Sequence, residues 1–177
     1  MGLLEPHGRG RRPFRRDGLT GPRASGPHSQ GGQNARAPEA APVIIIHSLA
    51  HAVAALSAAA EASRSAILAS PPDAGIYAGP GWFSEIMRAA REAVPGAQFR
   101  PLLDCGDDAG AAMAAIRAGL EAIVFTGRAD VAARLADIAL QAGARLLTER
   151  PAAALDLGAS FFADNDMLRR RCAEILA

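Results

Sequence analysis

The densest group of residues that could do chemistry lies between Asp104 and Asp108, in the sequence Asp-Cys-Gly-Asp-Asp. It directly follows Phe99–Leu103, a short apolar run that predicts a β-strand. An aspartate at the end of a strand can transfer a proton to a hydroxyl group of a bound ligand, so Asp104 is the candidate catalytic residue. Asp107 is a candidate ligand-binding residue, although either Asp107 or Asp108 could instead cap the helix that begins at Ala109.

Cys105 and His47 are weak candidate metal ligands. Zinc takes four nitrogen, sulfur or oxygen ligands, and a thiolate with carboxylates and so few histidines is a poor set. We therefore expect no metal cofactor from these residues alone. Cys105 could instead act as a nucleophile if His47 faced it and accepted its proton. A lone cysteine at a strand end is more commonly a small buried apolar residue.

The composition excludes several classes of enzyme. All 19 basic residues are arginine, so the chain has no lysine amine. Schiff-base aldolases, pyridoxal phosphate enzymes and P-loop nucleotide hydrolases all require that amine. The two cysteines, Cys105 and Cys172, form no CxxC pair, so neither a disulfide framework nor a structural zinc site is predicted.

The first forty residues differ from the rest in charge and composition. Residues 1–40 carry seven arginines and three acidic residues, a balance of +4, whereas residues 41–177 have a balance of −3. The leading segment is rich in Gly, Pro and Ser and has few large apolar side chains, so burial cannot offset the entropy of ordering it. We expect residues 1–40 to be a disordered Arg/Gly/Pro-rich tail. Its arginines lack the repeated aromatic residues of single-strand binders, so we expect no nucleic-acid partner.

The remaining sequence gives no sign of a membrane or secreted protein. Half of the chain is hydrophobic, yet no apolar run approaches the roughly 18 residues that a membrane span needs. The arginine-rich start has no apolar stretch of the kind that a secretory signal contains. We therefore expect a cytoplasmic protein with no membrane partner.

From residue 41 onward, short apolar runs alternate with helical patterns. The β-branched run Val43–Ile46 is too short for a helix and is typical of a buried parallel strand. The other predicted strands span residues 66–69, 99–103, 122–125, 144–147 and 160–163. The predicted helices span residues 48–62, 82–93, 109–118, 130–142, 152–157 and 166–176. This alternation predicts an α/β domain over residues 41–177, built from right-handed βα units on a parallel sheet.

Two architectures fit this alternation: a partial TIM barrel, and an open doubly wound sheet of the flavodoxin-like type. In either one, chemistry lies at the carboxyl ends of the strands. The candidate binding residues there are Ser70, Thr126 and Gly127, in addition to those around Asp104. The glycine-rich loop 75–81, which contains Gly79, is primarily a turn and only secondarily a cradle for a phosphate.

Three segments in order carry a resemblance to a known family. They read HAVAALSAAAEASRSAILAS, SPPDAGIYAGPGWFSEIMRAAREAVP and RPLLDCGDDAGAAMAAIRAGLEAIVFTG, and they cover residues 51–127 with little interruption. Together they resemble the opening helix and second strand, the Tyr-Ala-Gly turn, and the Leu-Asp-His-Gly strand of the zinc-dependent class II fructose/tagatose-bisphosphate aldolases. The similarity continues more faintly to Leu147-Thr148-Glu149. It favours the partial barrel.

The resemblance implies roles for individual residues. Asp104 stands where the family has its acid/base aspartate, and Cys105 stands where the family has its first zinc-binding histidine. Ser70 matches a serine near the substrate phosphate, and Glu149 falls near a glutamate of an alternative metal position. The later zinc histidines have no counterpart, because no histidine follows His51. We therefore expect no cofactor, and zinc only if the family's metal site survives in this chain.

These observations lead to two hypotheses about function. The preferred one is a shortened, degenerate aldolase-like protein without zinc-dependent lyase activity, which binds a protein partner or a small ligand such as a phosphorylated sugar. The alternative is an active, metal-free lyase, isomerase or hydrolase of carbohydrate metabolism that uses Asp104, with His47 or Cys105. In both cases the few βα units leave open sheet edges, so we expect a homo-oligomer or another partner that covers the edge.

Overall fold

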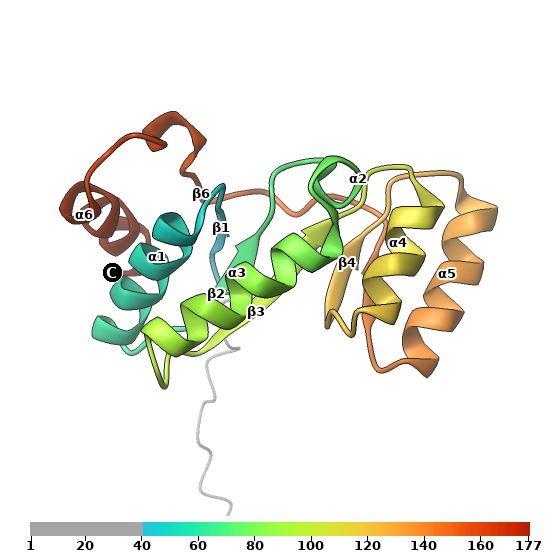
Figure 1. The fold of residues 1–177 in the computed structure, drawn as a ribbon, viewed down its shortest axis with the longest axis horizontal. Coiled ribbons are helices and arrows are strands. Elements are labelled where there is room, and N and C mark those ends of the chain that lie inside the picture. Colours follow the sequence, from blue (N-terminus) through green and yellow to red (C-terminus); the bar gives the residue numbers. More distant parts are fainter. Residues whose placement is uncertain (1–40) are drawn as a thin grey trace, which may run out of the picture. The chain divides into compact units, whose positions relative to one another are not determined.

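The computed structural model describes residues 41–177, and these residues form an α/β domain (Figure 1). Six strands make up the sheet: β1 (Val43–Ile45), β2 (Ala66–Ala69), β3 (Phe99–Asp104), β4 (Ala122–Val124), β5 (Arg145–Leu147) and β6 (Leu155–Asp156). The helices are α1 (Leu49–Glu61), α2 (Ala74–Tyr77), α3 (Gly79–Ala93), α4 (Ala109–Arg117), α5 (Ala129–Gln141) and α6 (Asn165–Leu176), with a 3-10 turn at Gly158–Ser160. The predicted tail lies outside the described residues.

All pairings in the sheet are parallel, and the strand order is β5-β4-β3-β2-β1-β6. The predicted parallel α/β domain is therefore confirmed. The order has features of both predicted architectures. β1 to β5 follow one another across the sheet as in a barrel, and β6 then returns to the other side of β1, as at the switch point of a doubly wound sheet.

The long helices form one layer on one face of the sheet. α6, α1, α3, α4 and α5 pack side by side in that order, with the strands behind them in Figure 1. This follows from the topology, because right-handed crossovers that all step in one direction place their helices on the same face. The main core lies between this layer and the sheet and includes Ile44, Leu68, Leu103, Ile123 and Phe83.

The other face of the sheet, which we call the open face, has no helix of the described residues upon it. The register places Ile45, Ala69 and Leu102 side by side on β1, β2 and β3. Val43, Ala69, Leu102 and Val124 form a second, small apolar cluster there. Parallel sheets are normally covered on both faces, so this half-covered apolar surface is an unusual feature of the fold.

The connection from β5 to β6, residues 148–154, crosses the open face. We call this segment the strap. It steps across the sheet in the direction opposite to the other connections, and a right-handed crossover in that direction lies on the opposite face. Accordingly, Pro151 of the strap borders the same surface as Leu102 and Leu147. The strap ends where Ala154 N donates to Val43 O at 2.8 Å, which aligns β6 with β1.

Two predicted elements were wrong. Residues 152–157 were expected to be helical, but they contain the end of the strap and the two-residue strand β6. Residues 160–163 were expected to form the sixth strand, but Gly158–Ser160 is a 3-10 turn, and Phe162 beyond it is 97% exposed. The predicted cap of α4 is confirmed, since the Asp108 side chain accepts a hydrogen bond from Ala111 N. Asp130, which the sequence also predicts as the cap of the helix over residues 130–142, lies within the first turn of α5 instead.

Candidate functional site

The carboxyl edge of the sheet holds a network centred on Asp104. The side chain of Asp104 is buried at the end of β3, and its Oδ1 accepts hydrogen bonds from Gly106 N at 2.8 Å and Asp73 N at 3.0 Å. Its Oδ2 accepts from Nε of Arg150 at 2.6 Å, and Nη2 of Arg150 also reaches Oδ1 at 3.2 Å. The strap thus carries the cation that pairs with the predicted catalytic aspartate.

Asp73 completes this network from the loop before α2. Its Oδ1 accepts a hydrogen bond from Nη2 of Arg150 at 2.7 Å. Asp73 has a φ of 62°, a left-handed conformation that side chains rarely adopt, and Gly106 opposite it has a φ of 55°. A Cβ atom on Gly106 would lie 2.3 Å from Oδ1 of Asp73, so the residue must be glycine. Two turns with positive φ angles therefore hold one arginine between two aspartates.

Ser70 is a structural partner of Asp104 in this geometry. Its Oγ accepts a hydrogen bond from Asp104 N at 2.9 Å and donates to the Pro71 carbonyl at 3.0 Å. Ser70 and Asp104 line a small cavity of about 40 Å³ under Arg150. This volume holds about one to three water molecules rather than a sugar phosphate.

The position that would carry the first zinc ligand is Cys105, which is fully buried beneath α2. A Cβ atom on Gly75 would lie only 2.8 Å from its Sγ, which shows how closely the helix covers the sulfur. Burial raises the pKa of the Cys105 thiol to about 12, with a smaller contribution from the charges of Asp104 and Asp108. The thiolate that a metal or a substrate needs is therefore strongly disfavoured.

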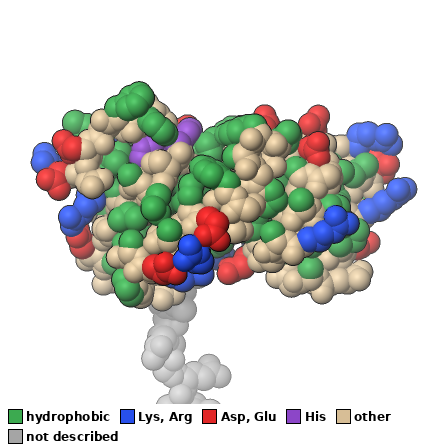
Figure 2. Space-filling view, viewed as in Figure 1, with side chains coloured by type: hydrophobic (Ala, Val, Ile, Leu, Met, Phe, Trp, Pro, Cys, Tyr) green, Lys and Arg blue, Asp and Glu red, His purple; other side chains and the backbone are tan. Residues whose placement is uncertain are grey.

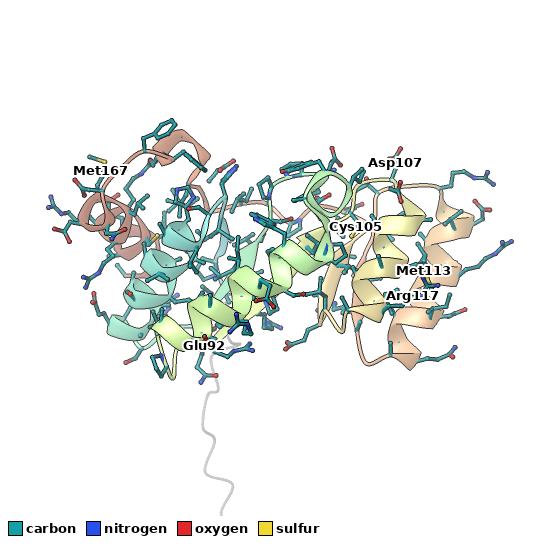
Figure 3. The ribbon with its side chains drawn as sticks, viewed as in Figure 1. Glu92, Cys105, Asp107, Met113, Arg117 and Met167 are labelled. Atoms are coloured by element: carbon teal, nitrogen blue, oxygen red, sulfur yellow. The ribbon has the colours of Figure 1, made fainter. Side chains whose placement is uncertain are left out.

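The donor set of the described residues does not fit zinc. Within residues 41–177, no three side chains of His, Cys, Asp or Glu gather closely enough to hold an ion. Figure 3 shows Cys105 between α3 and α4. Glu149 is exposed at the start of the strap, and His47 is engaged elsewhere.

His47 forms a second polar cluster, together with Asp156 and His51. Its Nε2 lies 2.7 Å from Oδ1 of Asp156, which also accepts from Gly158 N at 2.8 Å. His51 is completely buried on α1, and its Nδ1 accepts a hydrogen bond from His47 N at 3.2 Å. Burial lowers the pKa of His51, and the nearby His47 lowers it further. Figure 2 shows histidine surface, in purple, near the upper rim of the domain.

The remaining predicted residues are spread along the same edge. Asp107 is exposed in the loop between β3 and α4, at the rim in Figure 3. Thr126 is exposed, and its backbone N donates to Gly106 O at 2.7 Å. Gly127 packs over the ring of Phe125, and Gly79 begins α3 in a left-handed conformation with a φ of 84°.

A ligand-sized groove lies on the open face. Its volume is about 460 Å³, within the range of small-molecule sites, roughly 300–1,000 Å³. Its floor is formed by apolar residues of four neighbouring strands, and the strap borders one end through Pro151. The lining residues of β2 to β5 are Ile67, Pro101, Leu102, Ala122 and Leu147.

Charged residues border the groove at the amino ends of the strands. Arg100 lies near the start of β3, Arg145 begins β5, and Glu121 directly precedes β4. All three are exposed. The groove therefore combines an apolar floor with a rim that carries two positive charges and one negative charge.

Sequence reasoning missed the residues that organise both regions. Arg150 and Asp73 hold Asp104, and Asp156 holds His47. Arg150 could have been singled out by its position, because it directly follows Glu149 just beyond the end of a predicted strand. Arg100 and Arg145 were visible as charges within predicted strands, which is unusual where both faces are buried.

Searches of the chain against protein-family models and against curated protein sequences found no match. Among the described residues, no helix has the length and apolar character needed to cross a membrane.

Proposed function

We propose that this domain is a small-molecule-binding protein whose ligand occupies the groove on the open face of the sheet. The observation that carries the proposal is the groove itself, with its volume of about 460 Å³ and its apolar floor. Apolar surface left open to water is costly, at roughly 25 cal/mol per Å², so covering it with a ligand is favourable. The carboxyl edge, by contrast, offers a cavity of about 40 Å³ whose polar groups already bind one another.

The proposal includes the absence of zinc-dependent lyase activity. Class II aldol chemistry needs a metal to polarise the ketone and to hold the charge of the enediolate. The support for this part is the donor set, since Cys105 is a buried thiol and His47 pairs with Asp156. The protein would then be a degenerate relative of the aldolases that retains an α/β scaffold and binds a ligand on a different surface.

A substitution that fills the groove tests the binding site. Ala122 lies on the groove floor in β4, and Ala122→Phe would occupy much of the space while suiting a strand. Ala133→Phe, on the exposed surface of α5, is the matched control. We expect a neutral apolar dye such as Nile red to bind the parent protein and Ala133→Phe saturably, and to lose its binding to Ala122→Phe. Equal binding to all three, or to none, would contradict the proposal.

The alternative function, a metal-free enzyme that uses Asp104, has its own test. Four donor contacts converge on this carboxylate, from Gly106, Asp73 and Arg150, so a proton transfer would have to disrupt an occupied acceptor. We expect no cleavage of fructose or tagatose bisphosphate and no saturable binding of dihydroxyacetone phosphate. Retro-aldol turnover that is abolished by Asp104→Asn would establish the alternative instead.

We also propose that the domain self-associates. The support is the strand order, in which β5 and β6 are the terminal strands of the sheet that residues 41–177 form, so that their outer edges have no strand partner among these residues. Sedimentation equilibrium is expected to show a concentration-dependent homo-oligomer. A single monomeric species across the whole concentration range would exclude self-association.

A further inference from the structure

The charges of the groove suggest the chemistry of its ligand. Within residues 41–177, neither Arg100 nor Arg145 makes an ion pair, whereas Arg88, Arg128, Arg150 and Arg169 all do. A guanidinium without a carboxylate partner is a strong donor for an anionic group. Arg100 and Arg145 border the same groove.

The register of the strands places these two arginines within reach of one anion. Leu103 pairs with Ile123 and Ile123 with Leu146, so the row that contains Leu102 and Ala122 also contains Arg145. Arg100 lies two residues upstream of that row on β3, two strands away from β5. With about 4.8 Å between strands and about 3.3 Å per residue, their Cα atoms are roughly 12 Å apart. Two arginine side chains can bridge this distance to a single carboxylate.

The alternation of side chains along β3 also places Arg100 on the open face, where the groove lies. Along β3, Arg100, Leu102 and Asp104 alternate onto one face, since successive side chains of a strand point to opposite faces. Leu102 and Asp104 line the cavity under Arg150, and Leu102 also lines the groove with Arg100. The open face is therefore positive at the amino ends of β3 and β5 and apolar in its middle. Toward the carboxyl ends, Arg150 and Asp104 offset each other's charge.

The apolar floor selects against a sugar. Hydroxyl groups placed over Ile67, Leu102 and Leu147 would lose water without gaining hydrogen bonds, which costs about 1–3 kcal/mol for each unpaired group. An alkyl or aryl group has no hydrogen bonds with water, so it does not incur this desolvation cost when it covers the floor. Glu121 reduces the positive charge of the rim but forms no ion pair with either arginine within the described residues.

We propose that the ligand of the groove is a small amphipathic acid, with its apolar body on the sheet and its carboxylate held by Arg100 and Arg145. This inference rests on the proposed function, because it assumes that the groove is the ligand site. The charge complementarity of the two unpaired guanidiniums is what favours a small acid over a second copy of the chain.

Octanoate and octanamide form a matched pair of probes, since they share a chain and differ in charge. Titration calorimetry with the full chain is expected to give octanoate an affinity about tenfold or more above that of octanamide. The double variant Arg100→Gln/Arg145→Gln should lower octanoate binding to the level of octanamide, with octanamide binding unchanged. The control is Arg117→Gln/Arg134→Gln, which removes the same charge from exposed positions of α4 and α5.

The possible results separate the inference from the proposed function. Binding of both probes with equal affinity, or an equal loss of octanoate binding in the control variant, would overturn the inference while leaving the groove as a site. Binding of neither probe would overturn the proposed function as well. An oligomer in the parent that dissociates in the Arg100/Arg145 variant would assign the face to a second copy and overturn the small-acid ligand.

Discussion

Arg150 and Asp104, which are 46 residues apart in sequence, form a charged hydrogen bond of 2.6 Å between Nε and Oδ2. The bond ties the strap, which the crossover places on the open face, to the carboxyl end of β3. The side chain of Asp104 is only 8% exposed, whereas that of Arg150 is 42% exposed. Water can solvate the guanidinium of Arg150 but has little access to the carboxylate of Asp104. The buried carboxylate therefore relies on Arg150 as a charged hydrogen-bond donor.

Arg150→Gln is expected to lower the free energy of unfolding by about 1–2 kcal/mol, because it removes a charged donor from a buried carboxylate. The exposed pair of Arg128 and Asp130 provides the control, and Arg128→Gln should change stability by less than about 0.5 kcal/mol. Urea unfolding of both variants measures the difference. Equal effects would show that the strap is held by other contacts.

The short helix α2 should tolerate no added methyl group at Gly75. A Cβ atom there would lie 2.8 Å from Sγ of Cys105 and 3.1 Å from the Asp104 carbonyl oxygen, and the backbone atom cannot move aside easily. Gly75→Ala is expected to destabilise the domain by about 1–3 kcal/mol. Gly81→Ala in α3 meets no atom within 4 Å and should leave stability unchanged or raise it by up to about 1 kcal/mol. Thermal unfolding that ranks the two variants the other way would contradict this packing.

The strands β1 to β4 could be predicted from the sequence because each is an apolar run bounded by a helical pattern. The caps Ser48 and Asp108 were also predictable, because each is a residue type that favours the N-cap and stands directly before a helical pattern. Both side chains accept a hydrogen bond from the first turn of their helix. β6 could not be predicted, since a two-residue strand has no period of its own. It exists because Ile44 and Ile45 offer unpaired backbone groups to Leu155 and Asp156.

The groove could not be predicted either, because it depends on the order of strands and on the face that each connection takes. The pattern of Phe161 and Phe162 indicated a strand, but these rings are 50% and 97% exposed and lie outside the sheet. Cys105 and Ser70 were correctly placed at strand ends, yet which way each side chain points was decided by packing against Gly75 and Asp104. The position of a residue along the chain therefore predicts that it lies at the carboxyl edge of the sheet. It does not predict whether its side chain is buried or which groups it contacts.

The stability of the domain should decrease as the pH falls below about 6.5. Burial, and secondarily His47, lowers the pKa of His51 in the folded state from its ordinary value of 6.5. The unfolded chain therefore takes up a proton first, binds more protons than the native state in this window, and gains stability relative to it. The loss continues until the pH reaches the folded pKa of His51.

The variant His51→Gln isolates this effect. Its free energy of unfolding should change less than that of the parent between about pH 7.5 and about pH 5.5, because the titrating imidazole is gone. Its stability at high pH is expected to be lower, since the His47 N–H loses the Nδ1 acceptor. Parallel pH profiles for parent and variant would show that His51 does not titrate differently in the two states.

Both cysteines should be unreactive in the native state. Burial raises the pKa of Cys105 to about 12 and that of Cys172 to about 11, so almost no thiolate exists near neutral pH. Ellman's reagent is expected to modify neither thiol until denaturant is added, and then to modify both. Rapid labelling of Cys105 in the folded protein would revive its role as a nucleophile.

The central claim, that a small ligand binds on the open face of the sheet, is tested most directly by locating the bound molecule. Amide chemical shifts of the isotope-labelled chain, followed while octanoate is added, report the position without an assumed activity. We predict that the saturable shifts lie on β2 to β5 and on the strap, around Ile67, Leu102, Ala122 and Pro151's neighbours. Shifts confined to the carboxyl edge around Asp107 and Thr126, or no saturable shifts at all, would contradict the account.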